Sequence, residues 1–283
     1  MRAESLYAKL QSDFIKDGIT DLNWAAKMPG LDSYLCAEFK LSGMGLMCDF
    51  TSEIEKVYTT VFLSDNVLEK ILSDNASNAM IFSHHPTNWS IEHHGGNYSA
   101  TEKYIAKLRE RSISVFVLHH PLDNFGEYST CKTLADSIGI KVERPAFLYC
   151  GAMCGVIGMT DCKTISELSE RYSKAVGHQT SLYQYGIENI AGEKIAVCPG
   201  GGNASFVIDE MLNNGIKTLI TGVTIHNNYS KQVHALEKEN GINVLGGTHY
   251  SSEKFAPMKM CSYFESLGLP CEFIGDTSDL YDL

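Results

Sequence analysis

The chain has 283 residues, of which 44% are apolar and 20% are charged, a composition that excludes disordered, collagen-like and coiled-coil proteins. Its 23 Lys and Arg against 34 Asp and Glu give a net charge of −11, so we expect no nucleic-acid surface and no attraction to an anionic membrane. The apolar runs, such as residues 115–118, are far shorter than the roughly 20 residues that cross a bilayer.

The first residues and the cysteines give information about the cellular location of the protein. Residues 1–7 lack the apolar stretch of a secretory signal, so we expect a cytoplasmic location. The nine cysteines show no repeated short spacing, and we expect them to be reduced thiols. Cys150 and Cys154, with Cys162, come nearest to a zinc motif, but their glycine-rich surroundings favour a strand and a turn instead.

In chain order, the first half alternates short apolar runs with helical patterns. We predict strands over 57–63, 79–82 and 113–118, and helices over 66–73, 101–111 and 129–138. Strands and helices that alternate at this spacing are typical of a mainly parallel sheet covered by helices.

The second half repeats this pattern after Arg144 and Pro145. The expected strands are 149–159, 194–198, 216–220, 242–245 and 271–274, and the expected helices are 165–176, 205–213, 230–240 and 252–267. The predicted class is therefore α/β, with mainly parallel or mixed sheets flanked by helices in two similar, intertwined units. We expect residues 1–135 with 241–283 to form a metal-binding α/β unit, and residues 136–240 a second, smaller α/β unit.

Histidines collect where the predicted strands end. His84 and His85 follow the strand 79–82, His119 and His120 follow 113–118, and His249 follows 242–245. The carboxyl ends of parallel strands converge on one edge of a sheet, where side chains from separate loops can meet. One such histidine is most often structural, but three positions of the same kind indicate a shared site.

Two carboxylates accompany these imidazoles. Asp123 lies four residues after His119, and Glu253 lies four residues after His249, which places them on one face of a helix that begins at Thr248. The candidate ligands are thus His84, His85, Asp123, His249 and Glu253. This mixed set suits Zn, Fe, Mn, Co or Ni, and five donors fit two divalent transition metal ions per chain that share a carboxylate better than one.

At these motifs the sequence resembles the Nif-three-like dinuclear metal-centre hexameric proteins, also called GTP cyclohydrolase 1 type 2 homologues. The resemblance runs almost end to end. Its matching segments are Gly45-Leu46, Ser83-His-His-Pro86, His119-His-Pro-Leu-Asp123, the glycine-rich turn at 196–203, and Thr248-His-Tyr-Ser-Ser-Glu253. The resemblance implies the same five metal ligands, a homohexamer, and a nucleotide or other small molecule as substrate.

The chain departs from the family pattern at two places. The segment Thr221-Gly-Val223 has a valine where the family often has a glutamate, although His226 follows it. His120 replaces a threonine beside His119. Both departures leave the five ligands intact and affect the residues around them, so we take His119 and His226 as candidates to assist catalysis beside the metals.

Other motifs carry weaker signals. Gly200, Gly201, Gly202 and Asn203 lie between a strand and a helix, where backbone N–H groups can hold a substrate or an anion, or can simply form a tight turn. The Walker and Rossmann spacings are absent. His178 and His234 are expected to be surface residues.

The resemblance implies hydrolytic opening of the GTP imidazole ring, for which metal-activated water is a suitable reagent. We therefore expect a metal-dependent hydrolase, because a family likeness by itself does not fix the substrate. Two alternatives remain open at this point: a metal-binding regulatory scaffold without turnover, and a two-metal phosphoesterase.

Overall fold

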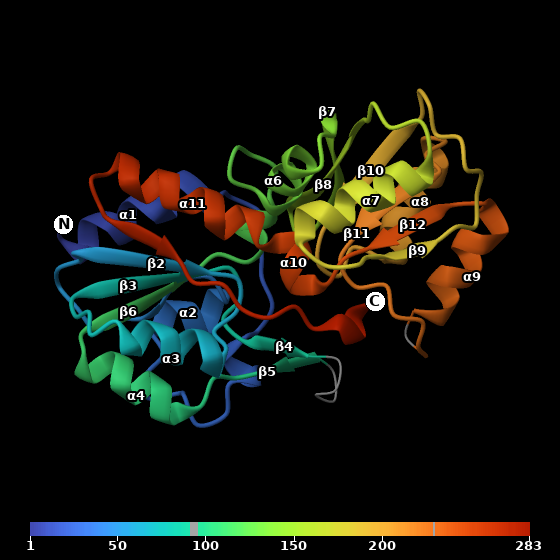
Figure 1. Cartoon of the computed structure of the whole chain (residues 1–283). Coiled ribbons are helices and arrows are strands. Elements are labelled where there is room, and N and C mark those ends of the chain that lie inside the picture. Colours follow the sequence, from blue (N-terminus) through green and yellow to red (C-terminus); the bar gives the residue numbers. More distant parts are fainter. Residues whose placement is uncertain (91–95, 229) are drawn as a thin grey trace. The chain divides into compact units, whose positions relative to one another are not determined.

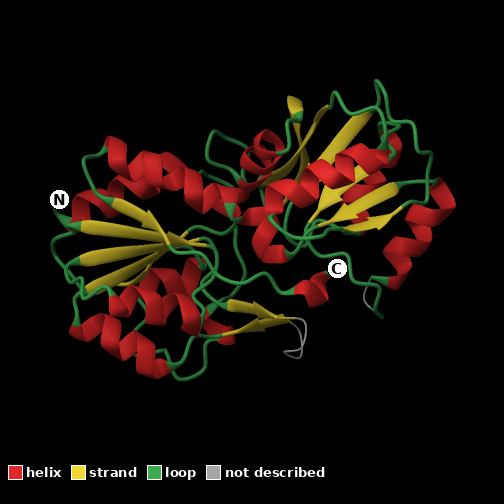
Figure 2. Cartoon of the chain, viewed as in Figure 1, coloured by secondary structure: helices red, strands yellow, loops and turns green. Residues whose placement is uncertain are grey.

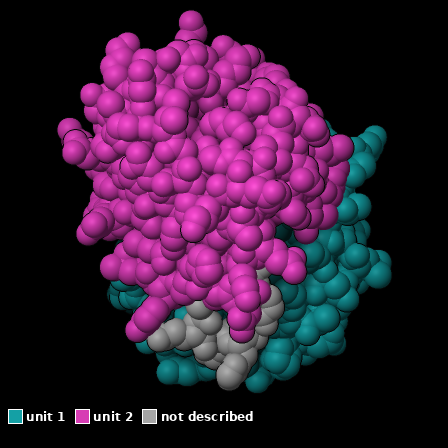
Figure 3. Space-filling model, turned by 90° about the vertical axis from the view of Figure 1, so that its right-hand side faces the viewer, with its two compact units in different colours: residues 1–122, 256–277 teal, residues 123–255, 278–283 magenta. Residues whose placement is uncertain are grey.

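The computed structural model describes residues 1–90, 96–228 and 230–283 (Figure 1). The chain forms two compact units, coloured separately in Figure 3. Unit 1 comprises residues 1–122 and 256–277, and unit 2 comprises residues 123–255 and 278–283. Both are α/β, with a sheet flanked by helices (Figure 2), which confirms the predicted fold class.

Unit 1 contains a five-stranded sheet with the order β1-β6-β3-β2-β13. β2, β3, β6 and β13 are parallel to their neighbours, and β1 runs antiparallel to β6 at one edge. Nearly every residue of the central strands is buried, which is why they read as continuous apolar runs. The strands are β1 (Gly45–Cys48), β2 (Lys56–Thr60), β3 (Ala79–Ser83), β6 (Ile113–Val117) and β13 (Cys271–Phe273).

Helices cover both faces of this sheet (Figure 1). Successive strand residues point to opposite faces: Ile81 and Val115 join the core beneath α2 to α4, whereas Phe82 packs against Phe264 of α11 and Phe116 against Tyr7 of α1. The helices are α1 (Ala3–Phe14), η1 (Ala25–Lys27), α2 (Ala37–Ser42), α3 (Asp65–Ser73), α4 (Glu102–Glu110), α5 (His120–Asp123) and α11 (Phe255–Ser266), and β4 (Asn88–Ser90) pairs with β5 (Gly96–Tyr98).

Unit 2 contains a six-stranded sheet with the order β7-β8-β10-β11-β12-β9. β10, β11 and β12 are parallel, whereas β7, β8 and β9 pair antiparallel. The strands are β7 (Lys141–Tyr149), β8 (Ala152–Met159), β9 (Ser181–Tyr183), β10 (Lys194–Cys198), β11 (Thr218–Thr221) and β12 (Asn243–Gly246), and the helices are α6 (Thr130–Ser137), α7 (Ile165–Val176), α8 (Ser205–Asn213), α9 (Lys231–Asn240), α10 (His249–Glu253) and η2 (Leu280–Asp282).

The structure differs from the expected elements in several places. Of the strand predicted over 149–159, residues 152–159 form β8. Cys150 and Gly151 adopt φ values of 49° and 81° and form the tight two-residue turn that joins β8 to β7 in a hairpin. The helix predicted over 252–267 is divided at Lys254 into α10 and α11. The prediction omits α1, α2 and the edge strands β1 and β9.

The unit boundaries also lie elsewhere than in the sequence-based division. Residues 123–135 and 241–255 belong to unit 2, since β12 pairs with β11 and α6 packs on β8 in that sheet. Within the described residues, no helix combines the length and the apolar character that a membrane crossing requires.

Candidate metal centre

His84 and His85 lie immediately after β3, in the interior of unit 1. Their backbone N–H groups continue the strand pairing, donating to Thr60 O at 3.1 Å and Val61 O at 2.8 Å. Both side chains are buried, with 0% and 2% exposure. The His84 Nδ1 lies 2.9 Å from Leu118 O; because a carbonyl only accepts, Nδ1 carries the proton and the Nε2 lone pair is directed elsewhere.

His119 completes an imidazole group in unit 1. It follows β6, the strand next to β3, and its ring centroid lies 4.6 Å from that of His85 and 5.4 Å from that of His84. One ligand atom from each of the three side chains lies within 4.8 Å of the others. This confirms that the strand ends bring histidines together, and it places His119 among the potential ligands, where the sequence suggested only an assisting role.

Asp21 fixes the orientation of His119. Its Oδ1 lies 2.8 Å from His119 Nδ1 and also accepts from Trp24 Nε1 at 2.8 Å. Burial alone would raise the pKa of Asp21, but the charge and hydrogen bond of His119 outweigh it and lower that pKa to about 2. A carboxylate that holds the far nitrogen of an imidazole is the usual partner of a metal-ligating histidine.

Aromatic side chains enclose His85. Phe62 stacks on its ring at 4.8 Å between centroids, and Trp24 meets it edge-on at 6.2 Å. These contacts restrict the rotation of the imidazole and leave little room for water around it. Packing on two sides therefore fixes the orientation of the His85 ring.

His120, the residue that breaks the family pattern, is also buried in unit 1. Its Nδ1 lies 2.7 Å from Thr20 O, and its backbone N–H donates to Asp21 Oδ2 at 3.2 Å. The side chain thus holds the loop that carries Asp21, although Asp21, His119 and His120 together also form a second group of potential ligands.

Unit 2 supplies a second imidazole and carboxylate pair. His249 Nε2 lies 3.3 Å from Glu253 Oε1, one turn along α10, and both residues are buried at 8% and 4% exposure. Thr248 caps this helix by accepting from Ser251 N, as the predicted helix start requires. The backbone N–H of His249 donates to Asp282 Oδ2 at 2.7 Å.

Gly200 lies against this pair. It has a φ of +59°, and a Cβ at this position would overlap the carboxylate of Glu253 and lie 3.1 Å from His249 Nε2. Its N–H donates to Ser252 Oγ at 2.9 Å. The glycine-rich turn therefore packs on the predicted ligands of unit 2, and only glycine leaves them room.

The remaining predicted residues lie as follows. Asp123, the first residue of unit 2, accepts from Thr130 Oγ1 at 2.7 Å. Gly201, Gly202 and Asn203 lead into α8, whose N-cap residue Ala204 provides no side-chain cap. Their role in binding an anion stays a prediction.

His226 and His234 form a separate cluster. Their rings stack at 4.8 Å, and His234 makes an ion pair with Glu237 at 3.0 Å. His234 is 2% exposed, so its prediction as a surface residue is wrong. Among the described residues His226 belongs to none of the potential metal groups, and its predicted assisting role stays a prediction.

Sequence reasoning missed Asp21 and Trp24, and no local pattern marks them because their partner His119 is about a hundred residues away. It also missed His178, whose Nε2 lies 2.8 Å from Ser251 Oγ at the start of α10. For the His234 pair a signal exists: a histidine and a glutamate three residues apart on a predicted helix.

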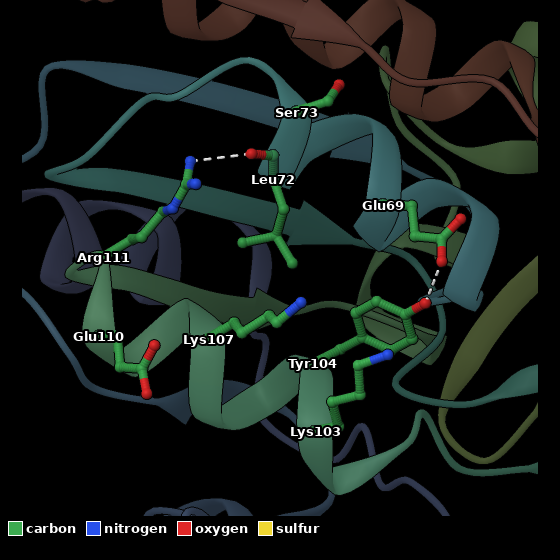
Figure 4. A pocket seen from close by; sticks show the side chains of 8 residues that line it. All are labelled: Glu69, Leu72, Ser73, Lys103, Tyr104, Lys107, Glu110 and Arg111. Atoms are coloured by element: carbon green, nitrogen blue, oxygen red, sulfur yellow. Dashed lines mark hydrogen bonds between the residues drawn. The ribbon is translucent and has the colours of Figure 1, made fainter.

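A pocket of about 350 Å³ lies elsewhere on unit 1, between α3 and α4. Figure 4 shows the charged side chains of Lys103 and Lys107 on α4 and of Arg111 just after it, with Arg111 donating to Leu72 O and the Tyr104 hydroxyl bonded to Glu69. None of the predicted ligands lines this pocket.

Comparison with known proteins agrees with the motifs. A GTP cyclohydrolase 1 type 2 homolog of Archaeoglobus fulgidus is 27% identical over 245 residues, which is 85% of this chain and 91% of that protein. A protein of the same name from Borreliella burgdorferi is 28% identical over 182 residues, 62% of this chain and 69% of that protein.

Solved structures share the fold. The protein ybgI, of unknown function, superposes with a TM-score of 0.75 at 19% identity and covers 98% of this chain and 99% of its own. Reduced HcgD from Methanocaldococcus jannaschii gives a TM-score of 0.70 at 20% identity, with 98% of both chains covered. The family model described as Duf34/NIF3 (NGG1p interacting factor 3) matches residues 35–277. The chain belongs to the Duf34/NIF3 family.

Proposed function

We propose that this protein is a hydrolase that depends on divalent transition metal ions, with a purine nucleotide such as GTP as the substrate class. The observation that carries the proposal is the buried group of His84, His85 and His119 at the ends of two adjacent parallel strands. Three imidazoles are costly to bury together in an apolar interior, and the ring nitrogens of neutral histidines are the commonest metal ligands in proteins.

We propose the five residues predicted from the sequence as the ligands of two metal ions, His84, His85, Asp123, His249 and Glu253, and we add His119 as a further ligand in unit 1. The donor set fits such ions, because imidazole and carboxylate without thiolate suit Zn, Fe, Mn, Co and Ni. Two contacts support this ligand set, because each holds a candidate ligand in a fixed position. They are the hydrogen bond between Asp21 and His119 in unit 1 and the packing of Gly200 on Glu253 in unit 2.

When bound, a pair of such ions supplies Lewis acidity and an activated water for attack on a purine ring. The protein's own residues set the conditions for that chemistry. Asp21 keeps the proton of His119 on Nδ1, and Leu118 O does the same for His84. Phe62 and Trp24 exclude water from the ring of His85.

The turn Gly200–Asn203 is the proposed binding site for the phosphate groups of the nucleotide. Two features support this assignment: the turn leads directly into α8, whose N-terminus carries no side-chain cap, and a helix N-terminus attracts phosphate. Its contact with Glu253 would place bound phosphate near the ligands of unit 2.

Metal analysis followed by activity assays tests the proposal. The purified protein is stripped with a chelator, reloaded with each candidate ion, and assayed with GTP for ring opening and with nucleotide phosphoesters for phosphate release. We expect two ions per chain and metal-dependent hydrolysis of the nucleotide. Stable metal binding with no turnover of any nucleotide would indicate a regulatory scaffold, and phosphate release without ring opening would indicate a phosphoesterase.

The proposal also includes the homohexamer that the family resemblance implies. Light scattering coupled to size-exclusion chromatography measures the mass directly. The same sample, with and without metal, also shows whether assembly depends on the ions.

A further inference from the structure

Two cysteine thiols of unit 1 face each other away from the candidate metal centre. Cys261 lies on α11 and Cys271 is the first residue of β13, the edge strand of the sheet. Their Sγ atoms are 3.2 Å apart. Both side chains are partly exposed, so a small reagent reaches them from solvent. The contact between Cys261 and Cys271 is the one thiol–thiol hydrogen bond found among the described residues.

Regular structure holds the two cysteines in place. Cys271 pairs with Val57 in the parallel ladder between β13 and β2, and the preceding carbonyl, Pro270 O, accepts from Val57 N at 2.9 Å. The turn from α11 is fixed by Leu269 N, which donates to Phe264 O. The sulfur atoms therefore meet because a helix and a strand pack together. A disulfide bond is about 2.05 Å long, so closing it from the 3.2 Å contact brings the two sulfur atoms about 1 Å closer.

The surroundings favour a thiolate on Cys261. The Cys271 thiol donates to its sulfur, and the Thr59 hydroxyl lies 3.3 Å from the same atom. The hydrogen bond from Cys271, more than any other contact, lowers the pKa of Cys261 to about 7, while the same bond raises the pKa of Cys271. Cys131 and Cys198 differ, because complete burial raises their thiol pKa.

We propose that Cys261 and Cys271 form a redox-active dithiol, which closes to an intramolecular disulfide on exchange with a small-molecule disulfide such as oxidised glutathione. The Cys261 thiolate attacks one sulfur of glutathione disulfide, forms a mixed disulfide and expels one glutathione thiolate. Cys271 then gives up its proton to solvent and attacks Cys261 Sγ, expelling the second glutathione thiolate. Two protein thiols are oxidised by two electrons, and one glutathione disulfide is reduced to two thiols.

This site is independent of the proposed hydrolase. Closing the disulfide links α11 to β13 within unit 1. α11 follows directly after α10, the helix that carries His249 and Glu253.

Redox titration of the full-length chain tests the proposal. The reduced protein is equilibrated in glutathione buffers of increasing oxidation, free thiols are blocked, and the intact mass and a peptide map are recorded. We expect loss of two hydrogens and a cross-link between the peptides of Cys261 and Cys271. In Cys271→Ser, we expect Cys261 to accumulate the glutathione mixed disulfide instead, because the resolving thiol is missing.

Cys36→Ser is the matched control, since Cys36 is also partly exposed, and its thiol neighbour Cys48 is fully buried, with burial raising the pKa of that thiol. We expect it to form the disulfide as the unmodified chain does. Cys261→Ser should form neither the cross-link nor a mixed disulfide at Cys271, and Cys271→Ala provides a second variant should the serine disturb folding, checked by circular dichroism. A wild-type chain that gives only mixed disulfides, or a cross-link that involves other cysteines, would overturn the proposal.

Discussion

Gly200 packs so closely on Glu253 that no side chain fits between them. Its φ of +59° and the position of the Glu253 carboxylate, with His249 Nε2 3.1 Å from the site of a Cβ, combine two independent demands for glycine. The glycine-rich turn, which the sequence offers either as an anion site or as a tight turn, thus packs directly on a predicted ligand. This contact connects the glycine-rich turn to the pair of His249 and Glu253, both in unit 2.

Gly200→Ala should weaken metal binding. The new methyl group displaces the Glu253 carboxylate, and a left-handed φ costs alanine about 1 kcal/mol of stability. Gly201→Ala is the control, because a Cβ there meets no atom within 4 Å. Metal affinity measured by chelator competition should fall for the first variant alone. Equal affinities would show that Glu253 does not bind metal.

Asp21→Asn should loosen His119 without changing the shape of the site. The amide lacks the negative charge, and its Nδ2 cannot accept the His120 N–H that Asp21 Oδ2 accepts. We therefore expect roughly a 10 to 100-fold loss of metal affinity, the usual effect of removing such a partner. Asp17→Asn, at an exposed position four residues earlier, should bind metal normally. If both variants retain full affinity, His119 is not a ligand.

Asp123→Ala and Glu253→Gln test the two predicted carboxylate ligands. Each change removes a negative charge that would balance two dications, so elemental analysis should find less than two ions per chain. Circular dichroism and light scattering should show the folded, assembled protein. Full metal content in either variant would remove that residue from the ligand set.

Alkylation of Cys261 should become fast near neutral pH. Because only the thiolate reacts, the rate rises as the pH passes through the pKa of about 7 that the Cys271 hydrogen bond sets. Cys36, whose pKa is raised by burial, should react about tenfold more slowly at pH 7. Iodoacetamide labelling followed by peptide mapping measures both rates. Identical pH profiles would contradict the assigned hydrogen bond.

The ion pair of His234 with Glu237 should stabilise the protein more at pH 6 than at alkaline pH. Burial alone would lower the pKa of His234, but the Glu237 hydrogen bond and charge outweigh it and raise that pKa above 6.5. A raised pKa in the folded state means that the stabilisation is complete below pH 6.5 and is lost as the pH rises through the folded value. His234→Ala should cost roughly 3 kcal/mol at pH 6, the size typical of a broken buried pair.

Denaturant unfolding at pH 6 and pH 9 checks this prediction. The loss caused by His234→Ala should be smaller at pH 9. His226→Ala, which leaves the ion pair intact, should show the same loss at both pH values, and a loss from His234→Ala that does not change with pH would refute the assignment.

The sequence by itself determined the fold class and identified most of the candidate metal ligands. Buried parallel strands are read easily, because continuous runs such as Ala79–Ser83 and Ile113–Val117 are apolar on both faces. Their carboxyl ends then identify His84, His85 and His119 without knowledge of the packing. Local spacing likewise predicts the pair His249 and Glu253, since one helical turn brings residues i and i+4 together.

Only the tertiary structure decided which distant residues contact the candidate ligands. The bond between Asp21 and His119 joins a loop to a strand end 98 residues later, and no periodicity records such a contact. The thiol pair of Cys261 and Cys271 depends on how α11 packs on an edge strand. The close packing of Gly200 on Glu253 depends on the turn after β10 meeting the helix α10, which follows β12. Sequence patterns report faces and turns of single elements, whereas these contacts arise from the way that separate elements pack.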